Sequence, residues 1–360
     1  MKQLWMHTGG MPPTVARIAR GAAVALKRLA QCVLVALGLL LLLLGLFIAT
    51  FLSPYFSSVD PGDLTACHPF KSEALKEKYL AYYDLRGARW PVAQETRFVE
   101  TRWGTSFVRI SGPKSGPPLV LLPGGGANSL MWAHVIRGLA ASRRVYALDN
   151  LGDIGRSVYR RPIASPDDVA ASLDDVFTAL GLGRDIDLVG MSYGGWQTAE
   201  LARLRPERLR RAVLIAPAAT VFDLPPDFAW RGILLLLPHR AFLESMMRWS
   251  LPDLARRTDP ESRAALETMT DDGYYGMRAF DLRMAANPRK LSDAELGSIR
   301  VPTLFVVGEH ETLYPAEEAV ARLRRAAPRI RTAIVPGAGH DLLVLLKERA
   351  TEEILGFLSP

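Results

Sequence analysis

A serine near the middle of the chain lies in a sequence that can make its hydroxyl reactive. Residues 190–194 read Gly-Met-Ser-Tyr-Gly, after a strand-like segment and before a helix-like one. A G-x-S-x-G turn between a strand and a helix holds its serine in a strained, exposed position at the rim of a sheet. Side chains at Gly190 and Gly194 would collide with the neighbouring strand and helix. We therefore predict that Ser192 is a nucleophile, although a serine in an isolated glycine-rich turn is usually structural.

A serine nucleophile needs a base, and the base needs an acid that orients it. His340 follows the β-branched segment 331–335, and the turn after the segment 301–307 carries Glu309 and Glu311. These residues, like Ser192, lie just past a predicted strand. Asp341 adjoins His340 and would have to fold back onto the imidazole ring. The residues alone leave Glu309 and Glu311 as candidate acids, and His310 between them is interpreted as a loop residue.

Several motifs together resemble a known superfamily. From about residue 79 to the C-terminus the chain resembles the α/β-hydrolases, and most of all the serine carboxylesterases of the carboxylesterase NP type. The matching stretches are residues 111–124, 149–157, 189–196, 308–311 and 337–340. The order serine, acid, histidine is also the order of the α/β-hydrolase triad.

The resemblance implies a role for each candidate residue. Ser192 is expected to be the nucleophile, His340 the general base and acid, and Glu311 the residue that orients the imidazole. Most members of the superfamily have an aspartate at the position of Glu311, and some esterases of this branch have a glutamate. The additional methylene requires that the turn carrying Glu311 lies slightly farther from His340.

Acyl transfer also needs N–H donors for the oxyanion that forms in the transition state. The apolar segment 119–122 ends in Pro-Gly-Gly-Gly, and glycines let the backbone approach a substrate closely. The register predicts the N–H groups of Gly125 and Tyr193 as the oxyanion hole, with Gly126 as a near alternative. A phosphate-binding loop is disfavoured because no Gly-Lys-Ser/Thr follows. The segment 149–157 is interpreted as architectural.

The N-terminus predicts a membrane anchor. Residues 33–52 contain no charge and are dominated by leucine. At about 1.5 Å per residue they span the roughly 30 Å hydrocarbon layer of a bilayer. Five bases and no acid precede this segment, which favours a cytoplasmic N-terminus and a catalytic domain on the exported side. A cleaved signal peptide is the alternative, but the apolar segment is longer than a signal core and no clear cleavage site follows.

Composition limits the classes of partner. The chain of 360 residues has a formal net charge of +7, but residues 1–28 carry five of its bases, which leaves 39 bases against 37 acids in the remainder. Nucleic-acid binding needs clustered surplus positive charge, so no nucleic-acid partner is expected. No cofactor or metal site is predicted. Cys32 and Cys67 flank the apolar segment on opposite sides and are not expected to pair.

The fold class and domain organisation follow from the same patterns. From residue 118 strands alternate with helices, which is typical of a doubly wound, mainly parallel sheet. The resemblance implies the α/β-hydrolase fold, with a mostly parallel eight-stranded sheet flanked by helices and a helical lid insertion. The expected parts are a basic tail (1–28), a transmembrane signal anchor (29–52), a linker (53–70), a first core part (71–220), the lid (221–300) and a second core part (301–360).

These predictions together describe a membrane-anchored serine hydrolase that cleaves carboxylic esters through an acyl-enzyme intermediate. The lid is rich in apolar residues, which favours small-molecule esters with an apolar acyl or alkyl group, because desolvating an unpaired charge is costly. We expect the lid to bury its own apolar stripe, and contact of residues 232–237 with the membrane is the alternative. Other α/β-hydrolase chemistry (carbon–carbon bond, thioester or amide hydrolysis, or perhydrolysis) and a catalytically silent, tethered binding protein remain alternatives.

Overall fold

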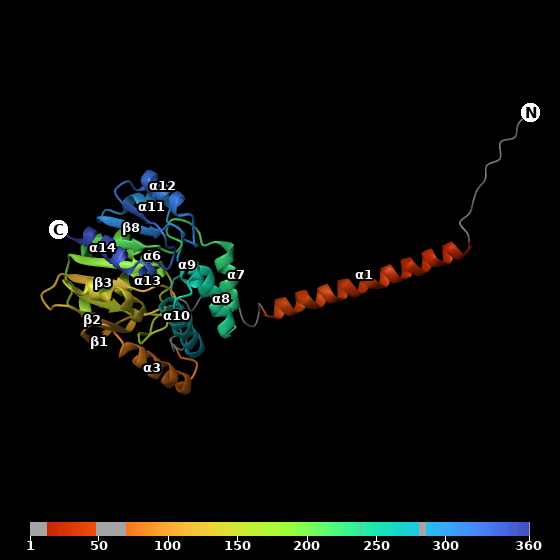
Figure 1. The fold of residues 1–360 in the computed structure, drawn as a ribbon, viewed down its shortest axis with the longest axis horizontal. Coiled ribbons are helices and arrows are strands. Elements are labelled where there is room, and N and C mark those ends of the chain that lie inside the picture. The colour runs from red at the N-terminus through yellow and green to blue at the C-terminus, as the bar shows by residue number, and fades with distance from the viewer. Residues whose placement is uncertain (1–12, 48–69, 238, 281–285, 360) are drawn as a thin grey trace, which may run out of the picture. The chain divides into compact units, whose positions relative to one another are not determined.

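The structure is a computed structural model that describes residues 13–47, 70–237, 239–280 and 286–359. The chain divides into two compact units, residues 1–58 and residues 59–360. The first unit contains the long helix α1 (Pro13–Phe47), drawn in red in Figure 1. Within α1 the segment Ala25–Leu43 has a mean hydropathy of 2.0 and none of it is buried, and it is long and apolar enough to cross a membrane. Residues 48–52 of the expected anchor and residues 53–69 of the expected linker lie outside the described residues.

The second unit is built on one mixed sheet of nine strands. The strand order is β1-β2-β4-β3-β6-β7-β8-β9, with β5 paired to β2. The strands are β1 (Gln94–Thr101), β2 (Gly104–Ser111), β3 (Pro118–Leu122), β4 (Arg144–Leu148), β5 (Val158–Tyr159), β6 (Ile186–Met191), β7 (Leu209–Ile215), β8 (Thr303–Gly308) and β9 (Arg331–Val335). From β4 to β9 along this order all pairs are parallel, whereas β2 is antiparallel to each of its neighbours.

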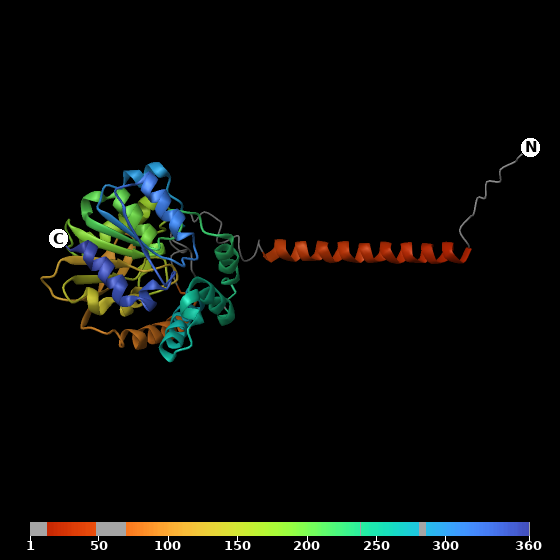
Figure 2. The same cartoon turned by 45° about the horizontal axis from the view of Figure 1, so that its top comes forward.

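The expected count of eight strands is therefore wrong by one. The additional strand β5 contains only two residues, which pair with Gly104 and Thr105 of β2. Two residues are too few to show the alternation by which a strand is recognised in a sequence. The α/β-hydrolase architecture that was expected otherwise agrees with the sheet, whose central strands are parallel and whose helices lie on both faces (Figures 1 and 2).

The central strands are apolar on both faces because helices cover both. Alternate residues of β6 and β7 belong to two different clusters of buried side chains, with Leu188 and Leu214 in one and Val189 and Val213 in the other. The first cluster includes α5 (Pro166–Ala179), α6 (Tyr193–Leu204), α11 (Asp293–Ser298) and α12 (Ala316–Ala326). The second includes α3 (Glu73–Gly87), α4 (Ile136–Leu139), α13 (Leu342–Leu345) and α14 (Lys347–Leu358). Near-continuous apolar runs are the expected sequence of such buried parallel strands.

The insertion between β7 and β8 is helical over most of its length. Before α11 it contains α7 (Pro226–Leu234), α8 (Arg240–Ser250), α9 (Pro252–Arg256) and α10 (Pro260–Ala279), which lie together beside one end of the sheet in Figure 1. Arg86 of α3 joins it to the rest of the unit through two hydrogen bonds, of 2.9 and 3.0 Å, to the Asp272 carboxylate of α10.

The expectation that the insertion buries its own apolar stripe is correct only in part. Leu243 and Met246 of α8 and Leu254 of α9 are buried, but α7 contains no buried residue.

Candidate functional site

The turn that carries Ser192 has the strained geometry that its sequence predicts. Ser192 follows β6 directly and has φ 54° and ψ −114°, a region that residues with a side chain rarely adopt. Its backbone N–H donates to the Ile215 carbonyl at 2.9 Å, and its carbonyl accepts from the Ala218 N–H at 3.0 Å. The end of β7 and the residues just after it therefore hold this backbone conformation in place from both sides.

The glycines of this turn are required by close backbone contacts. A Cβ atom at Gly190 would lie 2.0 Å from the Gly194 carbonyl oxygen, and one at Gly194 would lie 2.2 Å from the Leu122 carbonyl oxygen. Both contacts are with backbone atoms, which cannot rotate away as a side chain can. Larger residues at either position would push α6 away from the sheet and displace Ser192.

His340 and Glu311 are in direct contact. The Nδ1 atom of His340 lies 3.0 Å from each oxygen of the Glu311 carboxylate. The side chain of Glu311 is fully buried and that of His340 is 12% exposed. The backbone N–H groups of Thr312 and Leu313 donate to Glu311 Oε1 at 2.9 and 3.0 Å. Because Nδ1 is engaged by the carboxylate, Nε2 is the ring nitrogen that remains for a reacting group.

The environment of His340 changes its proton affinity in two opposing ways. Burial alone would lower the pKa of His340, but the charge and the hydrogen bond of Glu311 raise this pKa above its ordinary value of 6.5. The carboxylate thus favours the imidazolium, the form that a histidine takes after it accepts a proton from a nucleophile.

The other acids and the second histidine near this pair have different partners. Glu309 is largely exposed and accepts a hydrogen bond from the Gly337 N–H at 3.1 Å. The Asp341 carboxylate accepts from the N–H groups of Leu254 and Gly339 and does not fold back onto the ring of His340. His310 is half-exposed and its Nδ1 lies 2.9 Å from the carboxylate of Asp253 in α9, in agreement with its interpretation as a loop residue.

Ser192, Glu311 and His340 all lie at the same edge of the sheet. They follow β6, β8 and β9, which are parallel through β7, so their carboxyl ends meet at one edge. Within the part of the chain that the structure describes, the Ser192 hydroxyl makes no hydrogen bond to His340. Hydrogen bonds of this kind are often long in a substrate-free site and shorten only when a substrate is bound.

The glycine-rich loop after β3 lies against the Ser192 turn. A Cβ atom at Gly124 would lie 3.5 Å from the Cβ of Ser192, and one at Gly125 would lie 3.5 Å from the Cβ of Tyr193. The Gly124 N–H donates to the Met131 sulfur at 3.2 Å. Among the described residues the Gly125 N–H has no hydrogen-bond acceptor. Tyr193 is the first residue of α6, so its N–H has no acceptor within that helix. Two N–H groups next to Ser192 are therefore free to bind an anion.

Asp153 decides which glycine of this loop remains free. Its carboxylate accepts the Gly126 N–H at 2.9 and 3.2 Å and the Ile154 N–H at 2.7 Å. Burial raises the pKa of Asp153 to about 7, although these two N–H groups act to lower it. The Gly126 N–H is thereby occupied, which favours Gly125 over Gly126 as an anion donor. The sequence predicts an architectural role for the segment containing Asp153, and the spacing of the chain gives no sign of this contact.

Two α-helices of the insertion touch the loops that carry Glu311 and His340. The Thr312 hydroxyl donates to the Ser250 carbonyl at the end of α8, and the Asp341 carboxylate accepts from Leu254 of α9 at 2.8 Å. The insertion is thus fixed to the edge of the sheet at which the candidate residues gather.

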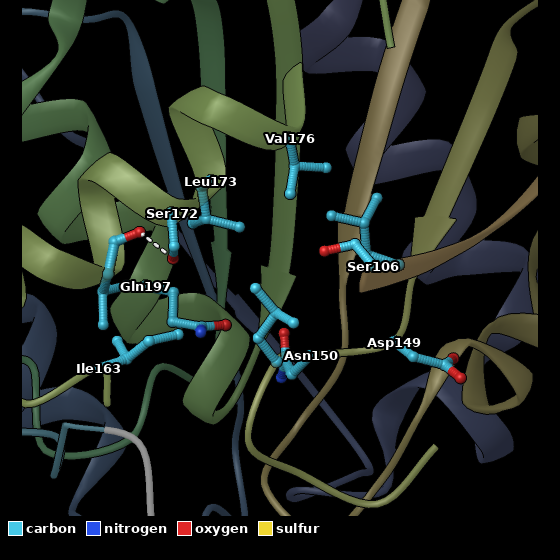
Figure 3. Close-up of a pocket in the computed structure, with 11 residues that line it drawn as sticks. Ser106, Asp149, Asn150, Ile163, Ser172, Leu173, Val176 and Gln197 are labelled. Carbon is cyan, nitrogen blue, oxygen red and sulfur yellow. Dashed lines mark hydrogen bonds between the residues drawn. The ribbon is translucent and has the colours of Figure 1, made fainter. Parts of the chain in front are cut away.

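A separate small cavity lies between β4, α5 and α6. Figure 3 shows it lined by polar side chains that include Ser106, Asn150 and Gln197, and its volume is about 20 Å³. The side-chain oxygens of Asn150 and Gln197 have no hydrogen-bond partner among the described residues. A cavity of this size and polarity can hold one buried water. Ser192, Glu311 and His340 do not line it, so it is not the candidate site.

Among the described residues no group of three or more His, Cys, Asp or Glu could hold a metal ion.

Comparison with known proteins places the chain in a family. Residues 119–355 match the model of the alpha/beta hydrolase family. The chain belongs to this family. Carboxylesterase YbfK of Bacillus subtilis is 32% identical over 284 residues, which are 78% of this chain and 93% of the relative. The crystal structure of naproxen esterase (carboxylesterase NP) from Bacillus subtilis is 28% identical, with a TM-score of 0.73 over 80% of this chain and all of that chain. The predicted resemblance to carboxylesterases is confirmed by these matches.

Proposed function

We propose that this alpha/beta hydrolase cleaves carboxylic esters with Ser192, His340 and Glu311 as its catalytic triad. The observation that carries the proposal is the contact of a buried glutamate with Nδ1 of His340, at the edge of the sheet that also bears a strained serine. The similarity to carboxylesterases over most of the chain supports ester bonds as the target.

The proposed reaction has two halves. The Ser192 oxygen attacks the ester carbonyl while His340 Nε2 takes the proton of the Ser192 hydroxyl. The Gly125 and Tyr193 N–H groups bind the resulting oxyanion. Collapse of this intermediate passes the proton from His340 to the leaving alcohol and leaves an acyl-enzyme. A water that is deprotonated by His340 then releases the acid and restores Ser192.

We also propose that α1 anchors the enzyme in a membrane with its N-terminus in the cytoplasm and the catalytic unit on the exported side. Its apolar segment Ala25–Leu43 covers about 28 Å at the rise of an α-helix, close to the thickness of the hydrocarbon layer. The bases Arg17, Lys27 and Arg28 lie on the N-terminal side of this segment or at its start, whereas the first base after it is Lys71.

Replacement of the nucleophile tests the reaction class. Ser192→Ala should abolish both p-nitrophenyl ester hydrolysis and labelling by a fluorophosphonate probe, because the hydroxyl that becomes acylated is absent. Ser298→Ala, which changes an exposed serine at the end of α11, should label like the unchanged enzyme. Undiminished labelling of Ser192→Ala would refute the assignment.

The role of Glu311 predicts a pH effect. Neutral His340 is the active form, so activity should fall as the pH drops through the raised pKa of His340. Glu311→Gln removes the charge that raises this pKa, so the acid limb of kcat/KM against pH should move to lower pH. The same change should lower kcat by about 10³- to 10⁴-fold, as an acid-to-amide change does in other serine hydrolases. An acid limb that stays at its original pH would contradict the role of Glu311.

Asp153 is expected to position the oxyanion donor. Asp153→Ala removes the acceptor of the Gly126 N–H and should lower kcat more than it raises KM, because Gly125 would no longer be held for the transition state. The loss should stay below the 10²- to 10³-fold cost of deleting an oxyanion donor. Asp153→Asn retains an acceptor oxygen and should recover most of kcat. If both variants show the same kcat as the unchanged enzyme, Asp153 does not position this loop.

The apolar insertion predicts a substrate preference. The rate of p-nitrophenyl ester hydrolysis should rise from acetate towards longer acyl chains, since apolar groups gain by leaving water. An acyl chain that ends in a carboxylate should react more slowly than its uncharged counterpart of the same length, because burying an unpaired charge is costly. Rates that fall from acetate onwards would contradict this preference.

A further inference from the structure

Helix α7 presents apolar side chains to solvent. None of its residues is buried, and Trp230 and Ile233 are each 44% exposed. Pro226 and Ala229 within the helix and Leu237 just after it are also exposed. Five apolar residues of one short segment are thus accessible.

These five residues form one stripe, which we call the α7 stripe. Their spacing of i, i+3, i+4, i+7 and i+11 places them on one face of a helix. Helical turns continue past Leu234, because the Leu237 N–H donates to the Leu234 carbonyl at 3.1 Å. In a soluble protein such a stripe ordinarily faces the core, and here it faces outward.

Contacts on the other side of α7 fix this orientation. The Arg231 guanidinium donates to the Ser245 hydroxyl of α8 at 2.6 Å and lies 5.6 Å from the ring centroid of Trp249. The rings of Phe228 and Trp249 are 6.3 Å apart. A rotation that buried the α7 stripe would break these contacts, so its exposure is built into the packing of α7 on α8.

Elsewhere in the described catalytic unit, the large exposed apolar side chains lie one each on three other elements. They are Leu85 of α3, Phe98 of β1 and Tyr275 of α10. Scattered apolar residues are normal on a protein surface, whereas a contiguous group marks a site of interaction. The α7 stripe is therefore the surface of the catalytic unit that needs a partner.

We propose that the α7 stripe docks onto the surface of the membrane in which α1 is embedded. This inference rests on the anchoring proposed above. Tryptophan is enriched at the boundary between headgroups and acyl chains. An amphipathic helix with aromatic and aliphatic residues on one face lies in that boundary.

Because α1 ties the catalytic unit to the bilayer, the α7 stripe meets the bilayer more readily than it meets a soluble partner. Residues 44–69 connect the apolar segment of α1 to the first described residue of the catalytic unit, and 26 residues reach at most roughly 90 Å. The catalytic unit therefore always remains near the bilayer, and tethering by a short linker corresponds to an effective concentration on the order of millimolar. Even a weak affinity of the α7 stripe for lipid is then sufficient. Docking would bring the insertion that contacts the Glu311 and His340 loops to the lipid surface.

A fluorescent label on the stripe tests the docking in the full chain. Ile233→Cys is made together with Cys32→Ser and Cys67→Ser, labelled with an environment-sensitive dye and reconstituted into vesicles of phosphatidylcholine and phosphatidylglycerol. Phe98→Cys in the same background is the matched control, because Phe98 is similarly exposed but lies on β1. We expect nitroxide-labelled lipids to quench the label at residue 233 several-fold more than the label at residue 98.

The outcomes separate docking from anchoring. Release of the protein from the vesicles by alkaline carbonate would show that α1 is not an anchor, and would overturn both proposals together. Retention with equal quenching at the two positions would overturn docking alone. Docking would also be overturned by a blue-shifted label at residue 233 that lipid nitroxides do not quench, because protein then covers the stripe. Loss of that unquenched blue shift when the ratio of protein to lipid is lowered would identify the covering protein as a second copy of the chain.

Discussion

The contact between Glu311 and His340 is the interaction on which the candidate site depends. It exists because β8 and β9 are adjacent and parallel, so that the turns after them meet. Two backbone N–H groups hold the carboxylate, and burial protects it from water, so the imidazole is held by Nδ1 and its Nε2 is left for chemistry. A shift of one strand relative to the other would separate the pair.

Ser192 depends on a second constraint, which is the close approach of backbone segments. The Ser192 turn is strained, and a strained turn persists only where its surroundings determine it. This turn is held by two hydrogen bonds, to the Ile215 carbonyl and from the Ala218 N–H, and by the close backbone contacts at Gly190 and Gly194. The loop after β3 is fixed in a similar way, since Met131 and Asp153 occupy the N–H groups on either side of Gly125. Packing thus leaves the Gly125 N–H open between two N–H groups that are occupied.

The helical insertion contacts the candidate site on one side and faces solvent on the other. Through Ser250 and Leu254 it contacts the loops of Glu311 and His340, and through α7 it presents an apolar stripe to the outside. The basic tail and apolar segment of α1 account for most of the net positive charge and much of the exposed apolar surface of the chain. The catalytic unit itself is nearly neutral, so its attraction to a membrane would depend on the α7 stripe more than on its charge.

The sequence by itself determined the features that depend on short spacing. The Gly-Met-Ser-Tyr-Gly turn, the order of Ser192, an acidic turn and His340 after three of the strands, the α/β architecture and the apolar segment of α1 are all readable from neighbouring residues, because steric limits and periodicity act locally. The two-residue strand β5 was missed, since so short a segment has no period.

Only the tertiary structure decided the matters that depend on residues far apart in the chain. Glu311 rather than Glu309 contacts His340, and Asp153 removes Gly126 from the possible anion donors. The stripe of α7 has a helical period that the sequence shows clearly, but periodicity does not say which way a stripe faces. The contacts of Phe228 and Arg231 with α8 decide which face of α7 is exposed. Although α8 follows α7 closely in the chain, its position depends on the packing of the whole insertion.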